Sequence, residues 1–402
     1  MPRSPAHIVG GGLVTALGRG LPAHARALAA GLARPAVSPV TFMGQPLPFH
    51  FAADPRAEGA SFQHMIETAV ADALADAALP AAAVVHMGVF IGSTCLDLPL
   101  HEAAYAATYA RGDVPAVKEP GYGNLARDIA ARHAIRGPQY TLSTACSSSA
   151  NALLYARGML AEGRIDHALV IGAEGYNRLS LLGFAGLMLL TRAEYRPFDR
   201  ARDGLVLGEG VGAMVLGREP RAGGAAIIGG ATACDPSSPT SSSRERIAEV
   251  IADALDDAGV APRQIAAIKA HGTGTPVNDL SEGQALLGIF GGSPPPLTSI
   301  KPALGHTLGA CGAIELLCML ACWREGFLPP TPGFSQADAA VGLAPETHAR
   351  GLGDGAMLCN FIGFGGNNTS LVLARSAGDE RREAAPGERT PGPAASGTRG
   401  QA

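Results

Sequence analysis

Cys146 is the residue of this sequence with the clearest setting for nucleophilic chemistry. An apolar and β-branched segment leads up to it, the small residues Ala145 and Ser147 flank it, and a run of helical composition follows. This order predicts a strand, a sharp turn and a helix, with the thiol at the start of the helix. Unpaired backbone N–H groups and the positive end of the helix dipole would then favour the thiolate, which is the nucleophilic form. The alternative is a buried structural cysteine, because free cysteine also behaves as a small core hydrophobe.

Three further segments place polar side chains at expected strand ends or helix starts. They are His-Gly-Thr-Gly-Thr-Pro at 271–276, the segment 299–310 with Lys301 and His306, and Gly-Phe-Gly-Gly at 363–366. Ligand sites of α/β folds gather where strands end, so these segments can converge on the thiol. One imidazole could deprotonate the thiol, and the other could hydrogen-bond a developing enolate or oxyanion. The glycines would let a backbone N–H reach the same oxyanion, so the set predicts acyl-thioester chemistry.

Each of these signals has a structural alternative when it is taken alone. A single histidine beside a glycine turn is more often structural than catalytic, Lys301 could be a surface charge, and most glycine-rich turns are only turns. Cys95 is the rival nucleophile, because it also follows an expected strand, but it lacks the helical pattern that follows Cys146. Catalysis is therefore predicted from the combination of motifs, and Cys95 is interpreted as structural.

The chain of 402 residues is rich in apolar residues and poor in charge. Its apolar fraction of 47% allows a large core, and its charged fraction is 16% with a net charge of −4. No basic stripe is present, so a nucleic-acid partner is not expected. The only lysines are Lys118, Lys269 and Lys301. In a chain that otherwise uses arginine, a lysine suggests that its position needs a compact, titratable charge.

The cysteine spacing and the N-terminus narrow the class of protein further. The seven cysteines show no CxxC spacing, so neither a zinc site nor a disulfide framework is expected. The first residues show no basic segment followed by a long apolar run, so no secretion signal is predicted. No uninterrupted stretch of about 18 apolar residues occurs, so no membrane span is predicted. A cytoplasmic location is the expectation.

Strand-like and helix-like segments alternate along the chain, which predicts an α/β fold with largely parallel sheets. Helices are expected at 21–33, 61–78, 147–161, 244–258 and 311–324, and strands at 7–16, 84–91, 167–174, 211–216, 265–270, 357–362 and 369–373. A further helix is expected to begin near Asp279, capped by Asp279 and Glu282. The layout divides into halves at 1–222 and 223–375. The segment 376–402 lacks an apolar period and is predicted to be a disordered tail.

Five motifs, taken together, resemble the β-ketoacyl-(acyl-carrier-protein) synthases of the elongating Cys-His-His type. They are Thr-Ala-Cys-Ser-Ser at 144–148, the block 196–210, the segments 271–276 and 301–310, and Gly-Phe-Gly-Gly-Asn at 363–367. The resemblance extends from His7 to about Arg375. It implies a thiolase-like fold with a duplicated five-layer α-β-α-β-α arrangement, usually dimeric. It also implies a decarboxylative Claisen condensation of an acyl group with malonyl carrier protein, which gives β-ketoacyl carrier protein and CO2.

The resemblance also assigns the reactive groups. Cys146 would carry the acyl chain as a thioester, and His271 and His306 would bind the malonyl thioester and support its decarboxylation. The backbone N–H groups of Cys146 and Phe364 would form the oxyanion hole, and Phe364 would also act as a gate. No metal and no cofactor are implied, because the loss of CO2 drives the carbon–carbon bond. The substrates would arrive on the phosphopantetheine arm of the carrier protein.

Supporting residues follow from the same resemblance. Lys301 would order the region of His306, together with Glu315. Thr273 and Thr275 would hydrogen-bond the pantetheine arm. The implied partners are an acyl carrier protein and either a second copy of the chain or a homologue of the chain-length-factor type.

Some features depart from the common family pattern. Asn367 and Asn368 stand where many relatives have Thr-Asn, and the chain is short, with a Ser-rich loop at 235–243. With the pair Asn278 and Asp279, these features resemble the ketosynthases of bacterial aryl polyene pigment clusters. Elongation of fatty acids is the alternative pathway. The acyl chain length and the surface that binds the carrier protein are not predicted.

Two other functions share the fold. A thiolase has a second catalytic cysteine near the C-terminal glycine turn, where Cys359 lies, but Cys359 is followed by Asn-Phe-Ile rather than by glycines. We interpret Cys359 as a residue of a strand core. A chain-length-factor subunit keeps the fold without the active cysteine. The presence of Cys146, His271 and His306 disfavours that non-catalytic function.

Overall fold

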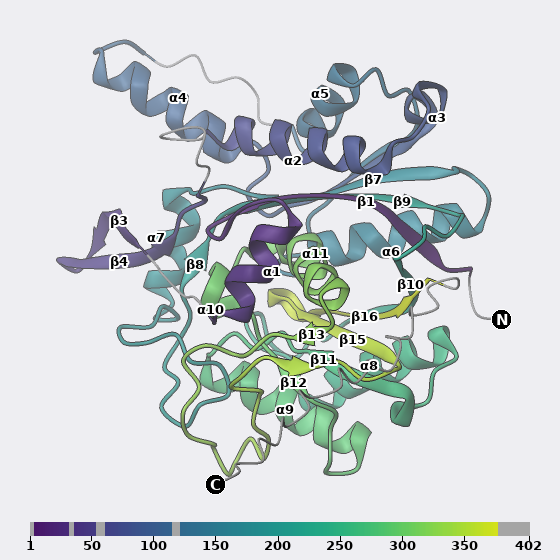
Figure 1. Cartoon of the computed structure of the whole chain (residues 1–402). Coiled ribbons are helices and arrows are strands. Elements are labelled where there is room, and N and C mark those ends of the chain that lie inside the picture. Colours follow the sequence, from purple (N-terminus) through teal and green to yellow (C-terminus); the bar gives the residue numbers. More distant parts are fainter. Residues whose placement is uncertain (1–3, 32–35, 54–60, 115–120, 377–402) are drawn as a thin grey trace, which may run out of the picture.

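One large mixed sheet organises the fold (Figure 1). The computed structural model describes residues 4–31, 36–53, 61–114 and 121–376. In spatial order, the hydrogen-bonded strands are β12 (Leu297–Thr298), β11 (Ile265–Lys269), β15 (Ala356–Ile362), β16 (Asn367–Arg375), β10 (Ala225–Cys234), β1 (Ala6–Thr15), β9 (Gly210–Gly217), β7 (His167–Glu174), β5 (Gly88–Gly92) and β6 (Gln139–Leu142). The short strand β2 (Gly18–Arg19) pairs with β1 beside this path.

The two halves of this path repeat one pattern. The spatial order β10-β16-β15-β11-β12 matches the spatial order β1-β9-β7-β5-β6. In each half, the first strand along the chain lies beside the last one, and the fourth, second and third strands follow. In each half the first two pairings are antiparallel and the last two are parallel. Along this path of strands, the two halves are joined where 6–8 on β1 pairs with 225–227 on β10. The loop after β6, which carries Cys146, therefore corresponds to the loop after β12, which leads to His306.

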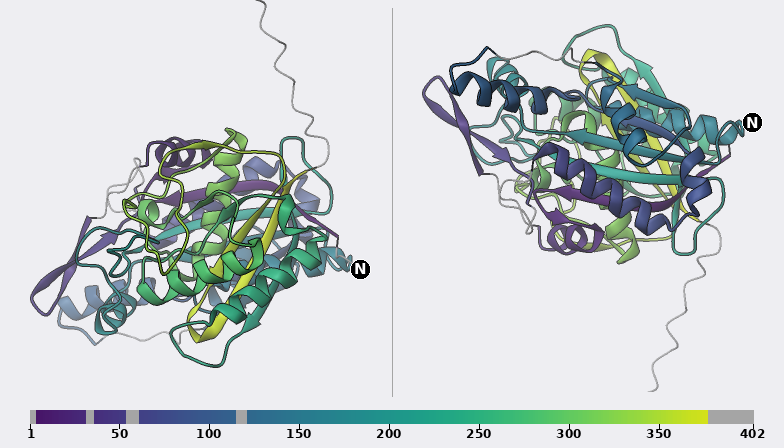
Figure 2. Two further views of the ribbon diagram at one scale, coloured as in Figure 1. Left: turned by 90° about the horizontal axis from the view of Figure 1, so that it is seen from below. Right: turned by 90° about the horizontal axis from the view of Figure 1, so that it is seen from above.

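Helices cover and separate the two half-sheets (Figures 1 and 2). On one outer face α2 (Phe62–Ala77) packs on β1 and β9, and on the other α8 (Arg244–Ala258) packs on β10 and β16. Between the sheets, α6 (Ser148–Ala161) packs on β5 and β7 and contacts α11 (Cys311–Arg324). The layers follow the order α-β-α-β-α, so the expected thiolase-like arrangement is confirmed.

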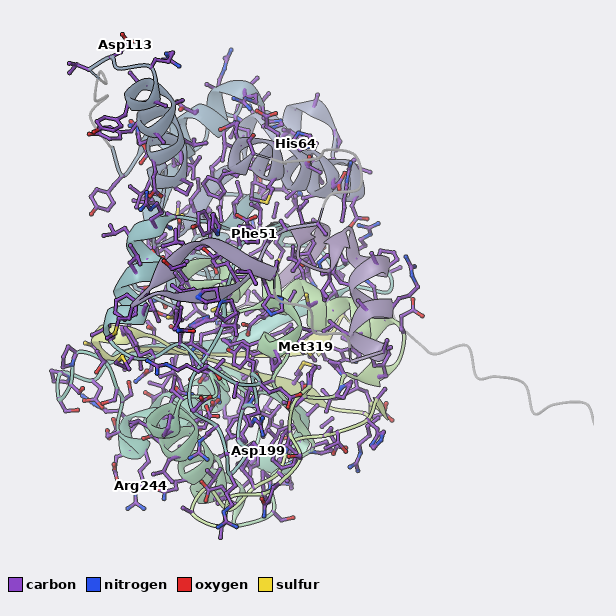
Figure 3. All side chains as sticks on the ribbon, turned by 90° about the vertical axis from the view of Figure 1, so that its left-hand side faces the viewer. Phe51, His64, Asp113, Asp199, Arg244 and Met319 are labelled. Carbon is purple, nitrogen blue, oxygen red and sulfur yellow. The ribbon has the colours of Figure 1, made fainter. Side chains whose placement is uncertain are left out.

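The central helix α11 shows why the middle layer forms. Its residues from Cys311 to Trp323 are all buried, and a helix that is apolar all round belongs in a core. Met319 of this helix lies in the interior of Figure 3, whereas Asp113 and Arg244 lie at the periphery. Strand β5 is buried at every position, as expected for a parallel strand that is covered on both faces.

The remaining elements surround this frame. The helices are α1 (Leu21–Ala29), α3 (Ala81–His86), α4 (Leu98–Ala110), α5 (Asn124–Arg132), α7 (Arg178–Gly186), α9 (Pro276–Phe290) and α10 (Lys301–Leu304). Strands β3 (Ala36–Phe42), β4 (Gln45–His50) and β8 (Leu207–Gly208) form a small sheet, and β13 (Phe327–Leu328) pairs with β14 (Arg350–Gly351). Within the described ranges, no helix has the length and apolar character needed to cross a membrane.

Several element boundaries differ from expectation. The strand expected at 84–91 begins only at Gly88, because 81–86 form α3. A short apolar run fits a helix and a strand equally well, which explains this wrong prediction. The helix expected at 21–33 ends at Ala29. The helix expected near Asp279 begins at Pro276, because proline is well accommodated in a first helical turn. Most of the predicted tail, 377–402, lies outside the described residues.

Candidate active site

Cys146 occupies the sharp turn between β6 and α6. Ala145 has a φ of 51°, in the left-handed region that disfavours residues other than glycine. The hydroxyls of Ser147 and Ser148 hold this turn by donating to the carbonyls of Thr144, at 2.8 Å, and Ala145, at 2.6 Å. The cysteine is only 4% exposed. The turn therefore presents the thiol rigidly beside the start of a helix, as the sequence predicts.

His306 lies on the corresponding turn of the second half, between α10 and α11. Its backbone N–H donates to the carbonyl of Val206 at 2.7 Å, and its carbonyl accepts the N–H of Gly208 at 3.1 Å. Gly305 has a φ of 75°, and a Cβ there would lie 2.7 Å from the backbone of Gly208. Only glycine fits this position, which fixes the backbone before His306.

His271 follows β11 in a loop that two buried carboxylates hold. The carboxylate of Glu282 accepts the backbone N–H groups of His271, at 2.7 Å, and Gly272, at 2.8 Å. The carboxylate of Asp279 accepts the N–H of Gly274 at 3.1 Å. The prediction that Asp279 and Glu282 cap a helix is wrong. Both lie inside α9 and bind the backbone N–H groups of the loop of His271 instead.

The three motifs converge on one cavity. Its volume is about 260 Å³, and Cys146, His271 and His306 all line it. The imidazole rings of His271 and His306 are nearly perpendicular, at 81°, with their centroids 5.4 Å apart. Nδ1 of each ring is buried without a hydrogen-bond partner among the described residues. Nε2 is therefore the nitrogen that is left to face a substrate.

The electrostatics of the cavity favour neutral side chains. Burial raises the pKa of the Cys146 thiol to about 12, although the Lys301 ammonium and a hydrogen bond from the backbone N–H of Phe364 lower it. Burial, followed by the charge of Lys301, lowers the pKa of His271 and His306 well below the ordinary value. The expectation that the helix start favours a resting thiolate is wrong, because desolvation of a charged sulfur outweighs it. A neutral imidazole can accept the thiol proton when an acyl group arrives.

A buried ion cluster lies behind the histidines. Nζ of Lys301 lies 2.5 Å from Oε1 of Glu315, which is the contact that the family resemblance implies. Nζ of Lys269 lies 2.5 Å from Oε2 of the same carboxylate. The sequence-based site did not include Lys269. The scarcity of lysine was the one signal that could have identified it.

The other cysteines differ from Cys146 in their surroundings. Cys95 is buried, and burial is the main cause that raises its pKa well above the ordinary value. Cys359 lies in β15, where burial raises its pKa to about 12, and it does not line the catalytic cavity. Cys311 is the first residue of α11 and donates from Sγ to the carbonyl of Cys146 at 2.9 Å. Cys234 is exposed.

Thr273, Thr275 and Phe364 line the cavity as well. The two threonine hydroxyls lie 2.9 Å apart, on the loop that His271 begins. The ring of Phe364 stacks on the ring of Phe184, with centroids 5.5 Å apart and an interplanar angle of 11°. Phe184 was not among the residues predicted for the site, because nothing in its local pattern shows that α7 faces the glycine turn.

We expect the substitution Phe184→Ala to slow the acylation of Cys146. A stacked aromatic pair contributes about 0.5–1.5 kcal/mol, which corresponds to about a 2- to 10-fold change in the population of the ordered Phe364 turn. Intact-mass time courses with an acyl carrier protein would measure the rate. Phe184→Leu is the matched control, because it keeps an apolar side chain of useful size without the ring. An unchanged rate in Phe184→Ala would show that the stack does not order the turn.

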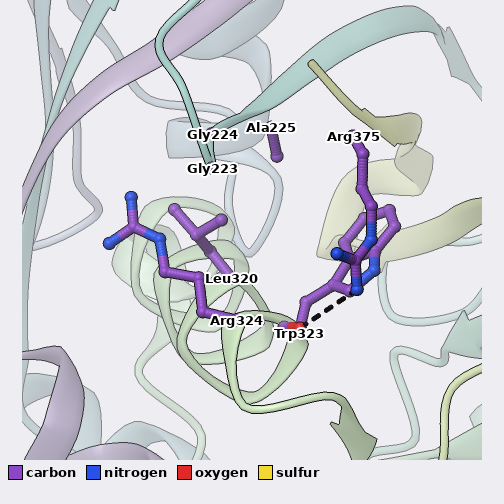
Figure 4. Close-up of a pocket in the computed structure, with 7 residues that line it drawn as sticks. All are labelled: Gly223, Gly224, Ala225, Leu320, Trp323, Arg324 and Arg375. Atoms are coloured by element: carbon purple, nitrogen blue, oxygen red, sulfur yellow. Dashed lines mark hydrogen bonds between the residues drawn. The ribbon is translucent and has the colours of Figure 1, made fainter. Parts of the chain in front are cut away.

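A second cavity lies at the other end of α11 (Figure 4). Its volume is about 220 Å³, and its lining residues are Gly223, Gly224, Ala225, Leu320, Trp323, Arg324 and Arg375. The 14 residues of α11 span about 20 Å, so this cavity is remote from the thiol. It contains no nucleophile, and the cavity with Cys146 is therefore the candidate active site. Within the described ranges, no three His, Cys, Asp or Glu side chains are grouped so that they could hold a metal ion.

Comparisons with known proteins identify the family to which this fold belongs. Residues 38–222 match the model of the beta-ketoacyl synthase N-terminal domain, and residues 224–335 match that of the C-terminal domain. The 3-oxoacyl-(acyl-carrier-protein) synthase 2 of Vibrio cholerae is 32% identical over 315 residues, which cover 72% of this chain and 76% of that protein. The protein of the same name from Rhizobium meliloti is 36% identical over 276 residues, which cover 63% and 65%.

Solved structures show the same likeness. The ketosynthase ApeO in complex with its chain length factor ApeC, from Xenorhabdus doucetiae, gives a TM-score of 0.81 at 28% identity. That match covers 93% of this chain and 98% of the other. The ishigamide ketosynthase/chain length factor gives a TM-score of 0.82 at 28% identity, and covers 93% and 100%.

Proposed function

The chain belongs to the β-ketoacyl synthase family and is an acyltransferase of the 3-oxoacyl-(acyl-carrier-protein) synthase type, and from this premise we propose its pathway, its residue roles and its partner. It condenses an acyl group with malonyl carrier protein. The pathway is the synthesis of an aryl polyene chain. The pairs Asn367-Asn368 and Asn278-Asp279, which resemble those of the aryl polyene ketosynthases, support this pathway over fatty-acid elongation.

The first step loads Cys146. An imidazole of the cavity takes the thiol proton while Sγ attacks the acyl thioester. The carrier-protein thiolate then leaves and takes up the proton. The backbone N–H groups of Cys146 and Phe364 stabilise the tetrahedral oxyanion. The hydrogen bond from Phe364 to the sulfur, which lowers the pKa of the thiol, supports this role because it places that N–H at the reacting atoms.

The second step makes the carbon–carbon bond. His271 and His306 donate from Nε2 to the thioester carbonyl of the malonyl group. The carbon–carbon bond to the carboxylate breaks and CO2 leaves. The electron pair of that bond forms the enolate. The enolate carbon attacks the acyl group on Cys146, and the sulfur leaves as a thiolate that takes a proton from solvent water. The observation that carries this function is the convergence of one thiol and two neutral imidazoles on one cavity.

Thr273 and Thr275 hydrogen-bond the pantetheine arm as it enters. Both threonines line the cavity that contains Cys146 and His271, and their hydroxyls lie 2.9 Å apart, which supports this role. The arm brings the substrate, and the protein itself uses no metal and no cofactor.

The partner is a second subunit of the same fold, of the chain-length-factor type. Two similar solved structures, those of the ishigamide ketosynthase and of ApeO, contain a ketosynthase with such a factor. Strand β6 ends the sheet, and its outer edge has no strand partner within the described ranges. An open edge of this kind is a template for pairing with another chain. The residues after β6 lead directly to Cys146, so a partner there would lie beside the acyl chain.

Intact-mass analysis tests the proposed function. The protein, alone and co-expressed with a chain-length-factor homologue, is mixed with carrier proteins that bear aryl polyenoyl or saturated acyl groups. We expect a thioester adduct on Cys146 and preferential loading of the aryl polyenoyl group. Preferential loading of saturated chains would support fatty-acid elongation instead. Cleavage of acetoacetyl-CoA by free CoA, without decarboxylation of malonyl carrier protein, would support a thiolase.

A further inference from the structure

The side chain of Lys269 lies at the centre of a buried polar chain behind the active site. Its Nζ lies 2.5 Å from Oε2 of Glu315 and donates to the carbonyl of Asn360 at 2.8 Å. It also lies 3.7 Å from the centroid of the Phe361 ring. Lys269 and Glu315 are at most 1% exposed. An ammonium that is removed from water needs this number of partners, so the position is built for a cation.

One end of the chain reaches the turn of His306. Lys301 is the first residue of α10, which ends at the residue before Gly305. Its Nζ binds the other oxygen of Glu315 at 2.5 Å, and its carbonyl accepts the N–H of Gly305 at 2.7 Å. The position of Glu315 therefore determines where the turn that carries His306 can lie.

The other end reaches the loop of His271. Nδ2 of Asn360 donates to Oε1 of Glu282 at 3.2 Å, and that oxygen also accepts the backbone N–H of His271. The second oxygen of Glu282 accepts the N–H of Gly272. Lys269 also precedes His271 by two residues in the same strand and loop. The contacts therefore run without a break from Lys301 through Glu315, Lys269, Asn360 and Glu282 to His271.

We propose that Lys269 is a positioning residue, which ties the His306 turn to the His271 loop and so fixes the spacing of the two imidazoles. This role rests on the proposed function of the histidines in decarboxylation. Their rings are 5.4 Å apart, and both must reach one thioester oxygen. An error of about 1 Å in such an arrangement can lower a rate by about 100-fold. Loading of Cys146 needs no fixed spacing, because a single imidazole can accept one proton.

The charge of Lys269 also indicates that this residue matters more for decarboxylation than for loading of Cys146. It is among the causes that lower the pKa of His271 and His306, after burial and Lys301. The main influences on the pKa of Cys146 include Lys301 but not Lys269. Although burial raises the pKa of the Cys311 and Cys359 thiols, the charge of Lys269 also acts to lower the pKa of both. The two lysines that share Glu315 should therefore have different effects on the two steps.

The test compares the two half-reactions in the variant Lys269→Met, which keeps the length of the side chain and removes its charge. Release of radiolabelled CO2 from malonyl carrier protein measures decarboxylation, and intact mass measures acylation of Cys146. We expect decarboxylation to fall by at least about tenfold in kcat with little change in KM, and acylation to change by less than about threefold. Lys301→Met should slow both reactions, because its charge also acts on the thiol.

Two more variants keep the proposal falsifiable if Lys269→Met does not fold. Asn360→Ala breaks the chain at the next link without changing a charge, and it should show the same selective loss. Phe361→Leu keeps the charge and the hydrogen bonds, so it should lower the melting temperature without separating the half-reactions. Equal loss of both half-reactions in Lys269→Met and Asn360→Ala would overturn the role of Lys269. A wild-type protein that is inactive in both half-reactions would instead overturn the proposed function.

Discussion

Replacing Cys146 with alanine should abolish acyl transfer and lower condensation by more than about a thousandfold, because no other group can take its place as the nucleophile. The structure supports this expectation, since Cys146 is the only cysteine among the residues that line the catalytic cavity as described. Intact mass should show no acyl adduct, and product analysis should show no β-ketoacyl carrier protein. The fold should persist, because alanine removes one sulfur from a turn that serine hydroxyls hold.

Cys322→Ala is the matched control for this experiment. Cys322 lies near the C-terminal end of α11 and does not line the cavity, so removing its thiol should leave acylation unchanged. Product formation by Cys146→Ala in an assembled complex would assign catalysis to the partner subunit. This chain would then be the non-catalytic, chain-length-factor type of subunit.

The substitution His306→Asn should separate the two half-reactions more completely than any other change. Asparagine preserves the backbone bonds to Val206 and Gly208 but places no imidazole at the malonyl carbonyl. We expect decarboxylation to fall by more than about a hundredfold, because one oxyanion donor contributes about that much or more. Acylation of Cys146 should continue, since His271 remains near the thiol. The assays are radiolabelled CO2 release and intact mass, run in parallel.

His348→Asn is the control, because His348 is exposed and does not line the cavity.

The pH dependence of the wild-type protein gives an independent check. A histidine is neutral above its pKa, and burial with the charge of Lys301 lowers the pKa of both catalytic histidines well below 6.5. The rate of decarboxylation should therefore stay nearly constant from about pH 8 down to about pH 6. A loss of rate centred near 6.5 would show that the imidazoles titrate as they do in water.

Local sequence patterns predicted several elements with their observed bounds. The buried strand at 167–174, the helix at 244–258 and the helix at 311–324 occur as predicted. The two helical patterns are long enough to satisfy only one kind of secondary structure. A run of eight residues can form either kind: the run at 167–174 is a strand, whereas the run at 84–91 begins with three helical residues.

The contacts of charged side chains were predicted less well than the burial of apolar ones. Asp279 and Glu282 have the spacing of a helix cap, yet they bind the N–H groups of the loop before the helix. Lys269 was recognised only as one of three lysines, and its contact with Glu315 joins residues 46 positions apart. A carboxylate or an ammonium can satisfy many partners, so its local sequence does not say which partner the fold will bring to it.

The sequence alone determined which side chains are chemically able to react, because three short motifs identify Cys146, His271 and His306. Only the tertiary structure decided how those groups are charged and held. Burial reversed the expected ionisation of Cys146, and contacts between distant elements placed Lys269 and Glu282 behind the histidines. The physical reason is that desolvation and long-range contacts depend on what surrounds a group in space, which neighbours in the chain do not specify.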